Sequence, residues 1–487
     1  MYYISTRGTA SGAPERLTAS QTIVKGIADD GGLYVPEEIP KAEHFNELLG
    51  KNYNAHALWQ LHHFLTDFTP AELAFCTDSA YNSANFDTPE IAPLFQVPDV
   101  AFLELFHGKT LAFKDMALSI LPHLMSVSLK KTQNPKTQII LTATSGDTGV
   151  SALEGFKNIP GTKIIVFYPE NGVSVIQKQH MVTMDGENVH VFGVKGNFDD
   201  AQSMVKKILL DSALKEKLSE NGFEFSSANS INTGRLIPQI VYYFYAYSLL
   251  VKNGTASGTP VNFIVPTGNF GNILAGYYAK KMGLPINKLI CASNENKVLF
   301  DYFDTGVFDS DRPFYLTSSP SMDILIPSNF ERLVFDILKP KDGLADKLEK
   351  LSNKQRFSLS PPNDFVGFCA TEAEARAAIK TVHSKYGYLI DPHTAVAYVA
   401  YEKYSAACPH EKHVIVSTAS PYKFAKTVMT SISEKYGAFD DFALLEQMAE
   451  LTSGNIPAAF VELKNKKILH NTTVEISQMQ DAVMNVV

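Results

Sequence analysis

Short β-rich runs alternate with helical segments from about residue 101 onward, and this alternation limits the fold more than any other feature. The runs are "QIILTA", "KIIVFYP", "VNFIVP" and "HVIVSTA", and the segments "VSALEGF" and "ILAGYYAKKMG" follow two of them after Gly-containing turns. Apolar strands separated by helices are typical of parallel sheets covered by helices. The sequence therefore predicts an α/β architecture.

The alternation also suggests how the chain is divided. Residues 1–100 lack the strand, Gly-turn, helix units and are predicted to form a separate N-terminal segment. We expect a smaller α/β domain over residues 101–235, a larger one over 236–430 and a C-terminal helical segment over 431–487. The polar stretch "KNGTASGTPVN" predicts a surface connection before the next strand.

Composition excludes several classes of partner. The 487 residues are 45% hydrophobic, which is enough to bury large cores, and the formal net charge is -8. A negative net charge argues against sequence-independent binding to nucleic acid or to an anionic membrane surface, so small-molecule partners are favoured.

The cysteines and the N-terminus predict a cytoplasmic protein. Four scattered cysteines form no CxxC pair, which indicates neither a zinc site nor a disulfide framework, and we predict no metal. The start "MYYISTRGTA" does not resemble a secretory signal. The apolar stretch "LIPQIVYYFYAYSLLVK" is too short and too polar for a membrane span and predicts a buried core helix.

Lys114 stands in "FHGKTLAFKDMAL", where its neighbours are largely apolar or small. An ordinary lysine is hydrated and lies on the surface. A desolvated lysine has a lowered pKa and a nucleophilic amine, which is the condition for forming a Schiff base. This stretch by itself leaves both interpretations open.

Two Gly-containing turns follow predicted strands and precede predicted helices. "TATSGDTG" carries Ser145, Asp147 and Thr148, and "PTGNFGN" includes Gly268 and Gly271. Backbone amides gather at such helix N-termini and attract anions, and glycine permits close approach of a phosphate. The second turn matches neither GxGxxG nor the P-loop. Taken singly, each turn is equally consistent with a capped strand-to-helix connection.

Two further motifs carry polar side chains suited to ligands. "NSINTGR" combines Asn229 and Asn232 with Arg235, whose guanidinium suits carboxylate or phosphate; a helix cap with a surface arginine is the alternative. "STAS" ends an apolar run with hydroxyls, among them Thr418.

In this order, the motifs resemble those of the pyridoxal-phosphate enzymes of the tryptophan synthase β fold, and more closely the threonine synthase family in its longer microbial and fungal form. The resemblance runs from "STRG" through "FHGKTLAFKD", "TATSGDTG", "NSINTGR", "VPTGNFGN" and "SPSMDI" to "STASPYKF". It implies an α/β fold of pyridoxal-phosphate fold type II, with two parallel-sheet domains and an added N-terminal segment.

The resemblance also implies roles for individual residues. Lys114 would hold pyridoxal 5'-phosphate covalently and act as the catalytic base. Thr418 would face the pyridine nitrogen as a neutral partner. The loop that would hold the cofactor phosphate consists of Gly268, Asn269, Phe270, Gly271 and Asn272.

Substrate roles follow from the same resemblance. Ser145, Asp147 and Thr148 would lie near the amino-acid carboxylate and the cofactor's 3′ oxygen, with the contact of Asp147 left open. Asn229 and Arg235 would bind the substrate phosphate, and Lys109 would add a positive charge nearby.

The activity implied is conversion of O-phospho-L-homoserine and water to L-threonine and phosphate, by a carbon-oxygen lyase that acts on phosphate and is a monomer or homodimer. Threonine or serine dehydratases of the same fold share the lysine and the glycine loop. A catalytically silent binding relative is a third interpretation.

Overall fold

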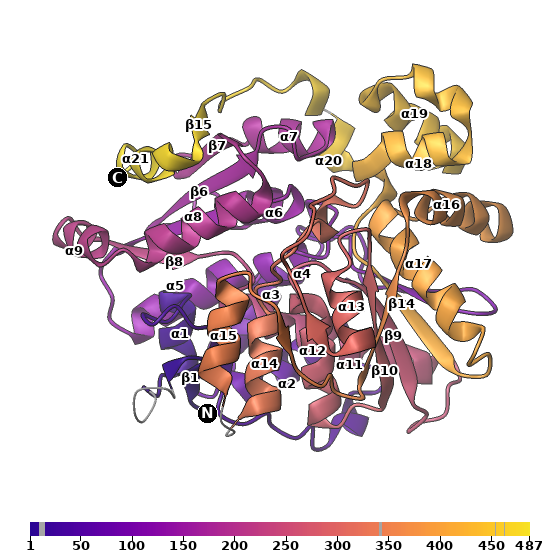
Figure 1. Ribbon diagram of the computed structural model, residues 1–487, viewed down its shortest axis with the longest axis horizontal. Coiled ribbons are helices and arrows are strands. Elements are labelled where there is room, and N and C mark those ends of the chain that lie inside the picture. Colours follow the sequence, from indigo (N-terminus) through magenta and orange to yellow (C-terminus); the bar gives the residue numbers. More distant parts are fainter. Residues whose placement is uncertain (9–14, 340–342, 453, 462) are drawn as a thin grey trace.

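Two mostly parallel sheets, each packed against helices, form the framework of the protein (Figure 1). The computed structural model describes residues 1–8, 15–339, 343–452, 454–461 and 463–487. Its two sheets confirm the predicted α/β architecture with two parallel-sheet units.

The smaller sheet has five parallel strands in the order β15-β7-β6-β5-β8. The strands are β5 (Thr137–Ala143), β6 (Thr162–Pro169), β7 (Val189–Lys195), β8 (Phe223–Ser227) and β15 (Thr473–Glu475). Strand β6 has the sequence TKIIVFYP and is buried along almost its whole length, because helices pack against the sheet. The helices of this unit are α6 (Asp147–Phe156), α7 (Val175–Val182), α8 (Phe198–Leu210), α9 (Ser212–Glu220) and α21 (Met479–Met484).

The larger sheet has the order β13-β10-β9-β14-β4-β3, and its strands are parallel except for β3, which is antiparallel to β4. The strands are β3 (Leu94–Gln96), β4 (Ala101–Glu104), β9 (Val261–Pro266), β10 (Ile286–Ser293), β13 (Phe365–Cys369) and β14 (Lys412–Ser417). Its helices are α11 (Pro238–Lys252), α12 (Gly271–Met282), α13 (Val298–Thr305), α16 (Glu372–Tyr386) and α17 (Pro392–Ser405).

The other elements connect or flank these two units. Two small antiparallel pairs are β1 (Tyr3–Ser5) with β2 (Tyr34–Pro36) and β11 (Val307–Phe308) with β12 (Phe357–Ser358). The other α-helices are α1 (Ala19–Lys25), α2 (Tyr53–Phe64), α3 (Pro70–Ala80), α4 (Asp115–Leu118), α5 (Leu121–Lys131), α10 (Thr233–Leu236), α14 (Phe330–Leu338), α15 (Leu344–Ser352), α18 (Ala425–Ile432), α19 (Asp441–Thr452) and α20 (Ala458–Val461). Short 3₁₀ turns span Phe45–Leu48, Pro320–Met322, Pro421–Phe424, Glu434–Ala438, Leu463–Asn465 and Ile476–Gln478.

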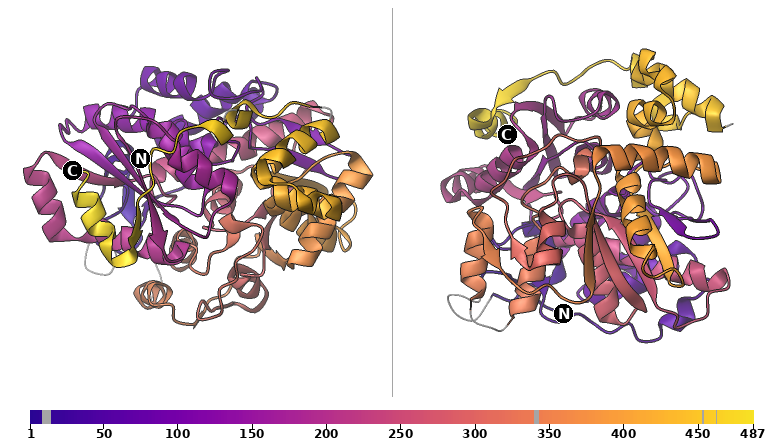
Figure 2. Two further views of the ribbon diagram at one scale, coloured as in Figure 1. Left: turned by 90° about the horizontal axis from the view of Figure 1, so that it is seen from above. Right: turned by 45° about the vertical axis from the view of Figure 1, so that its right-hand side comes forward.

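Sheet membership differs from the sequence-based division at two places. Strand β4 lies within residues 101–235 but pairs with β14 in the larger sheet. Strand β15 belongs to the C-terminal segment, which is therefore not only helical, and it pairs with β7 at the edge of the smaller sheet. Figure 2 shows this segment running from α19 across the molecule to the C-terminus. Both pairings join residues far apart in the chain, so local patterns do not reveal them.

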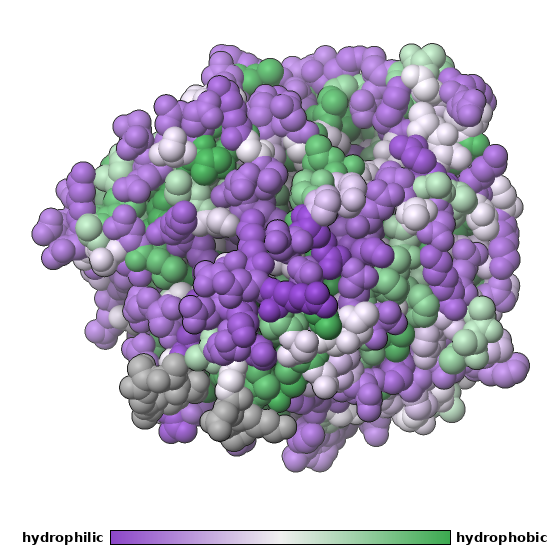
Figure 3. Space-filling view, viewed as in Figure 1, coloured by the Kyte–Doolittle hydropathy of each residue, from purple (hydrophilic) through white to green (hydrophobic). Residues whose placement is uncertain are grey.

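The long apolar stretch near residue 240 is a core helix, as predicted. Helix α11 is buried on nearly all sides, and α2 and α12 pack against it. Among the described residues, no helix combines the length and the apolar character that a membrane crossing requires. The face shown in Figure 3 is mostly hydrophilic, with hydrophobic residues in separate groups.

Candidate active site

Lys114 is a buried lysine that lies just before helix α4, with only 7% of its surface exposed. Its Nζ donates hydrogen bonds to Asp147 Oδ2 at 3.2 Å and to Ser321 Oγ at 3.0 Å. The ring of Phe113 lies 4.7 Å from the same nitrogen. Burial lowers the pKa of the Lys114 amine, against the attraction of Asp147. The structure thus places Lys114 in the surroundings that make an amine nucleophilic.

A cavity beside Lys114 is lined by elements of both sheets. It contains most of the site residues that the sequence suggested, and its lining consists of Phe113, Lys114, Ser145, Thr148, Phe198, Asn229, Ser230, Arg235, Gln239, residues 266–272, Ser321, Met322, Ile324, His393 and Thr418. The loops at the carboxyl ends of β5, β9 and β14 supply many of these residues, because parallel strands end at the same edge of their sheet.

The turn after β5 is shaped by Thr144, whose hydroxyl accepts hydrogen bonds from the amides of Gly146 and Gly149. Ser145 and Thr148 line the cavity. Asp147 instead lies behind it, almost fully buried, and binds Lys114. The turn therefore presents two hydroxyl side chains to the cavity and one carboxylate to the lysine.

The loop between β9 and α12 is held tightly against the turn at Pro320–Met322. A Cβ atom on Gly268 would lie 2.1 Å from the carbonyl oxygen of Ser321, so only glycine fits there. Phe270 precedes the helix with a φ of 65°, and its ring packs edge-on against Phe330. Gly271 begins α12, whose first amides have no acceptor within the helix.

Asn272 directs an unpartnered amide group at this site. Its Oδ1 accepts hydrogen bonds from the hydroxyls of Tyr242 at 2.7 Å and Tyr243 at 2.8 Å, which fixes the orientation of the side chain. Its Nδ2 is buried and has no hydrogen-bond partner among the residues that the structure describes. Asn269 differs, because its amide bonds to Gln202 and Ser328 hold the loop in place.

Arg235 is a buried cation with few partners. One guanidinium nitrogen, Nη1, donates to the carbonyl oxygen of Ala228, and Nε has no hydrogen-bond partner in the described part of the chain. Burial lowers its pKa to about 10, so it remains charged at neutral pH. Among the described residues, no carboxylate forms an ion pair with it. An unpaired buried charge is costly, so this guanidinium favours an anionic ligand.

The two asparagines of the same motif have different surroundings. Asn229 lines the cavity while its side chain bonds to both the amide and the carbonyl of Ala143. Asn232 caps helix α10 and also donates to the carbonyls of Ile23 and Ser227. The helix-cap interpretation therefore holds for Asn232.

Thr418 follows the end of β14 and lines the cavity. Its carbonyl accepts a hydrogen bond from the amide of Phe113 at 2.8 Å. This contact places the end of β14 beside the residue that precedes Lys114.

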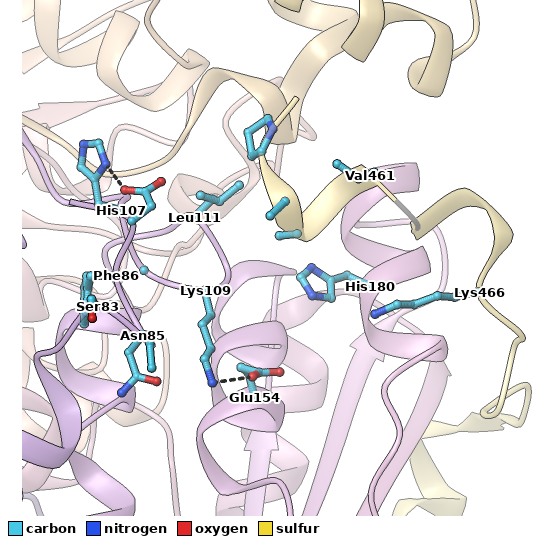
Figure 4. A pocket seen from close by; sticks show the side chains of 16 residues that line it. Ser83, Asn85, Phe86, His107, Lys109, Leu111, Glu154, His180, Val461 and Lys466 are labelled. Atoms are coloured by element: carbon cyan, nitrogen blue, oxygen red, sulfur yellow. Dashed lines mark hydrogen bonds and ion pairs between the residues drawn. The ribbon is translucent and has the colours of Figure 1, made fainter. Parts of the chain in front are cut away.

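Lys109 is not brought to this cavity, contrary to the expectation of a second cation beside Asn229 and Arg235. Its Nζ forms an ion pair with Glu154 at 3.2 Å, and it lines a separate cavity of about 580 Å³ (Figure 4). The chain turns sharply at Leu111, which has a φ of 59°, and this turn lies between Lys109 and Lys114.

Three residues near the lysine were missed as site residues. Ser321 and Lys423 lie within quoted motifs, "SPSMDI" and "STASPYKF", but carried no assigned role. His393 gave no signal in the sequence. Its Nδ1 lies 2.6 Å from Asp391 Oδ2, and its Nε2 accepts a hydrogen bond from the amide of Ser321 at 3.1 Å.

Three family models together match most of the chain, and the second and third overlap over residues 394–419. Residues 2–81 match the threonine synthase N terminus, residues 84–419 the pyridoxal-phosphate dependent enzymes and residues 394–472 the C-terminal part of threonine synthase. This chain belongs to the threonine synthase family. The family is pyridoxal-phosphate dependent and has fold type II, as the motifs implied.

Relatives and solved structures agree with this assignment. The threonine synthase of Saccharomyces cerevisiae is 33% identical over 96% of this chain and 97% of its own length. Threonine synthase-like 1 of Macaca fascicularis is 40% identical over 85% of this chain, which spans only 58% of that relative. The threonine synthase of Brucella melitensis with bound PLP has a TM-score of 0.84 at 35% identity, covering 100% of this chain and 99% of its own.

The cavity of this threonine synthase family member fits pyridoxal phosphate. The N-terminus of α12 and the unpartnered Asn272 Nδ2 provide donors for a phosphate group, and Lys114 provides a buried amine. In the described part of the chain, no group of His, Cys, Asp and Glu is arranged to hold a metal ion.

Proposed function

We propose that this protein is a threonine synthase that converts O-phospho-L-homoserine and water to L-threonine and phosphate. The observation that carries the proposal is Arg235, a buried guanidinium facing the cavity with an unpartnered Nε. The names of several near-full-length relatives, from Saccharomyces cerevisiae, Pseudomonas aeruginosa and Methylobacillus glycogenes, support it.

Pyridoxal phosphate, when bound, would withdraw electrons from the carbon next to the substrate nitrogen. Lys114 would hold the cofactor covalently, and residues 268–272 would bind its phosphate. Thr418 would offer a hydroxyl to the pyridine nitrogen. A neutral partner of this kind would not keep that nitrogen protonated, which favours a lysine that moves protons promptly.

A single base would transfer protons at the substrate's carbons in turn. Lys114 would remove the proton from Cα, and the protons at Cβ and Cγ lie within one or two bonds of the same carbon. Loss of a Cβ proton would allow phosphate to leave from Cγ, Cγ would be protonated to become the methyl carbon, water would add at Cβ, and Cα would regain a proton as threonine is released. The buried position of Lys114 would limit the access of other water. Ser145 and Thr148 would orient the amino-acid carboxylate.

Arg235 would bind the substrate's phosphate and stabilise the negative charge that grows as the phosphate departs. Electrostatic stabilisation of this kind contributes about 3 to 4 kcal/mol in other enzymes. Asn229 would add an amide donor beside it. A dehydratase acting on threonine or serine has no phosphate to bind and would leave the buried cation without a ligand.

The substitution Arg235→Lys tests this proposal. It keeps the charge but removes the planar fork, so kcat/KM for O-phospho-L-homoserine should fall more than tenfold, a loss of about 1.4 kcal/mol of transition-state stabilisation. Cofactor binding and reaction with amino acids lacking phosphate should change little, and inhibition by inorganic phosphate should weaken in parallel.

Equal losses on phosphorylated and unphosphorylated amino acids would assign Arg235 a structural role. They would favour the dehydratase interpretation, which predicts 2-oxobutyrate formation from threonine. A protein without bound cofactor and without either activity would instead support a silent binding relative.

A further inference from the structure

A second buried lysine stands behind the candidate active site. Lys423 belongs to the 3₁₀ turn Pro421–Phe424, and only 1% of its surface is exposed. Its Nζ forms an ion pair with Asp147 Oδ1 at 2.8 Å and donates a hydrogen bond to the carbonyl oxygen of Thr110 at 2.7 Å. Lys423 is not among the residues that line the cavity beside Lys114. Any effect on the reaction must therefore pass through another residue.

That other residue is Asp147, whose two oxygens face different partners. Oδ1 forms an ion pair with Lys423 and accepts a hydrogen bond from Gln177 Nε2 at 2.7 Å. Oδ2 accepts from Lys114 Nζ at 3.2 Å and from Ser321 Oγ at 3.4 Å. The contact with Lys423 is shorter than the contact with Lys114, so the carboxylate is shared unequally between two cations.

Several charged groups surround Lys114, so the way in which Asp147 is shared affects the protonation of the Lys114 amine. Lys423 and Arg235 lie close enough to oppose a positive charge on Lys114, and Asp147 favours it. Asp115, on helix α4, is already bound by the amide and hydroxyl of Thr110.

His393 faces Asp147 from α17, and its ring is bound by Asp391 and Ser321. Although burial alone would raise the pKa of Asp147, the ammonium groups of Lys423 and Lys114 hold it well below its ordinary value. Asp147 is therefore an ionised carboxylate at neutral pH.

We propose that Lys423 is a positioning residue for Lys114: it binds Asp147 from behind, so that the carboxylate orients the Lys114 amine without forming an exclusive ion pair with it. If Asp147 had Lys114 as its only cation, the buried pair would keep that amine protonated and unreactive. With Lys423 present, the carboxylate is neutralised by one cation, and the other can give up its proton.

This inference rests on the proposed role of Lys114, but its test does not depend on catalysis. In the cofactor-depleted full-length chain, competitive labelling with acetic anhydride, read by peptide mass spectrometry, gives the pH midpoint of the Lys114 amine. Lys423→Met removes the charge at similar volume and should raise this midpoint by at least about one pH unit. Lys423→Arg keeps the charge and should leave the midpoint near the wild-type value.

The matched control is Lys281→Met. Lys281 forms an ion pair with Asp336 Oδ2 at 2.6 Å at the other end of α12, so the substitution removes a lysine cation elsewhere. The Lys114 midpoint should not move. An equal shift in this control would attribute the effect to net charge and overturn the proposal.

Lys423→Gln removes the charge but keeps a hydrogen-bond donor for Asp147 and Thr110, which provides the test if Lys423→Met does not fold; its Lys114 midpoint should also rise. A folded Lys423→Met or Lys423→Gln with an unchanged midpoint would show that Lys423 only anchors the chain at Thr110. The Lys114 midpoint is measured without substrate, so equal losses of Arg235→Lys on phosphorylated and unphosphorylated amino acids would overturn the proposed function alone, and an unchanged midpoint in Lys423→Met would overturn this inference alone.

Discussion

Two buried arginines, Arg332 and Arg235, differ in what their guanidinium groups contact. Arg332 on α14 donates to the carbonyl oxygens of Tyr34, Ser230 and Ile231 at 3.0, 3.1 and 2.6 Å, and also to Asn329 Oδ1. Arg235 donates to a single carbonyl and has an unpartnered Nε in a cavity. Burial lowers the pKa of both to about 10.

The neighbouring asparagines repeat this difference. Asn329 Nδ2 donates to Ser230 Oγ and to the carbonyl of Asn269, whereas Asn272 Nδ2 donates to no group. In the region around Arg332, the buried donors are therefore hydrogen-bonded to other segments of the chain and hold these segments together. The region around Arg235 has donors without partners among the described residues, and we expect a bound anion to accept hydrogen bonds from them.

The largest effect is expected from Lys114→Ala at the cavity. Threonine formation should fall at least about a thousandfold, because the substitution removes both the covalent attachment and the base. The variant should remain folded, since it removes a buried amine rather than a packed apolar group. Borohydride reduction of the wild type followed by peptide mapping should find the cofactor on Lys114; an adduct on a different lysine would contradict the assignment.

Arg332→Lys sharpens the contrast between the two arginines. We expect it to lower the free energy of unfolding by about 3 kcal/mol, because several buried carbonyls lose their donors. Arg235→Lys should lower it by less than about 1 kcal/mol, since one carbonyl is affected. Chemical denaturation of both variants measures this, and the reverse order would invalidate the comparison.

Asn272→Ala should weaken cofactor binding without unfolding the protein. Loss of one amide donor to a phosphate corresponds to about 1.4 kcal/mol, or about tenfold in the dissociation constant. The control is Asn329→Ala, which should reduce stability and leave the intrinsic cofactor affinity of the folded protein nearly unchanged. Titration of cofactor-depleted protein with pyridoxal phosphate measures both; similar affinities for Asn272→Ala and wild type would show that Nδ2 has no phosphate partner.

The last effect concerns Glu331, the residue before Arg332 on α14, at low pH. Glu331 accepts hydrogen bonds from Arg7 and Thr6, and although burial alone would raise its pKa, Arg7 holds it below the ordinary value of 4.5. A depressed carboxyl pKa contributes stability above about pH 4.5 that is lost as the pH falls through the folded-state value.

Glu331→Gln should therefore be less stable than the wild type near pH 7, by no more than about 1 to 2 kcal/mol because Arg7 is partly exposed. The difference should shrink as the medium becomes acidic. Thermal unfolding from pH 7 to pH 3 measures it, and a difference that stays constant over this range would argue against a charged Glu331.

Much of this arrangement could be predicted from local patterns. Apolar runs followed by Gly-containing turns identify β5 and β9, and residues such as Ser145 and Gly268 lie where parallel strands end. Arg235 was singled out because a guanidinium follows two amide residues in a motif of the family. Its cavity position agrees with the expectation, while its role stays a prediction.

Other features depend on contacts between distant parts of the chain. Lys109 was expected near Arg235 from the resemblance to the family, but it pairs with Glu154, and the turn at Leu111 lies between it and Lys114. The ion pair of Asp147 with Lys423 joins two motifs, and neither motif by itself indicates that they lie close together in the fold. Strand β15 also could not be predicted from local patterns, because it pairs with β7 of the smaller sheet although it follows all strands of the larger sheet in sequence.

The most direct test of the proposed threonine synthase activity is a product assay on the purified protein. With O-phospho-L-homoserine, the account predicts phosphate and L-threonine in equal amounts, and competitive inhibition by inorganic phosphate. No phosphate release from this substrate, together with 2-oxobutyrate formed from threonine, would contradict it.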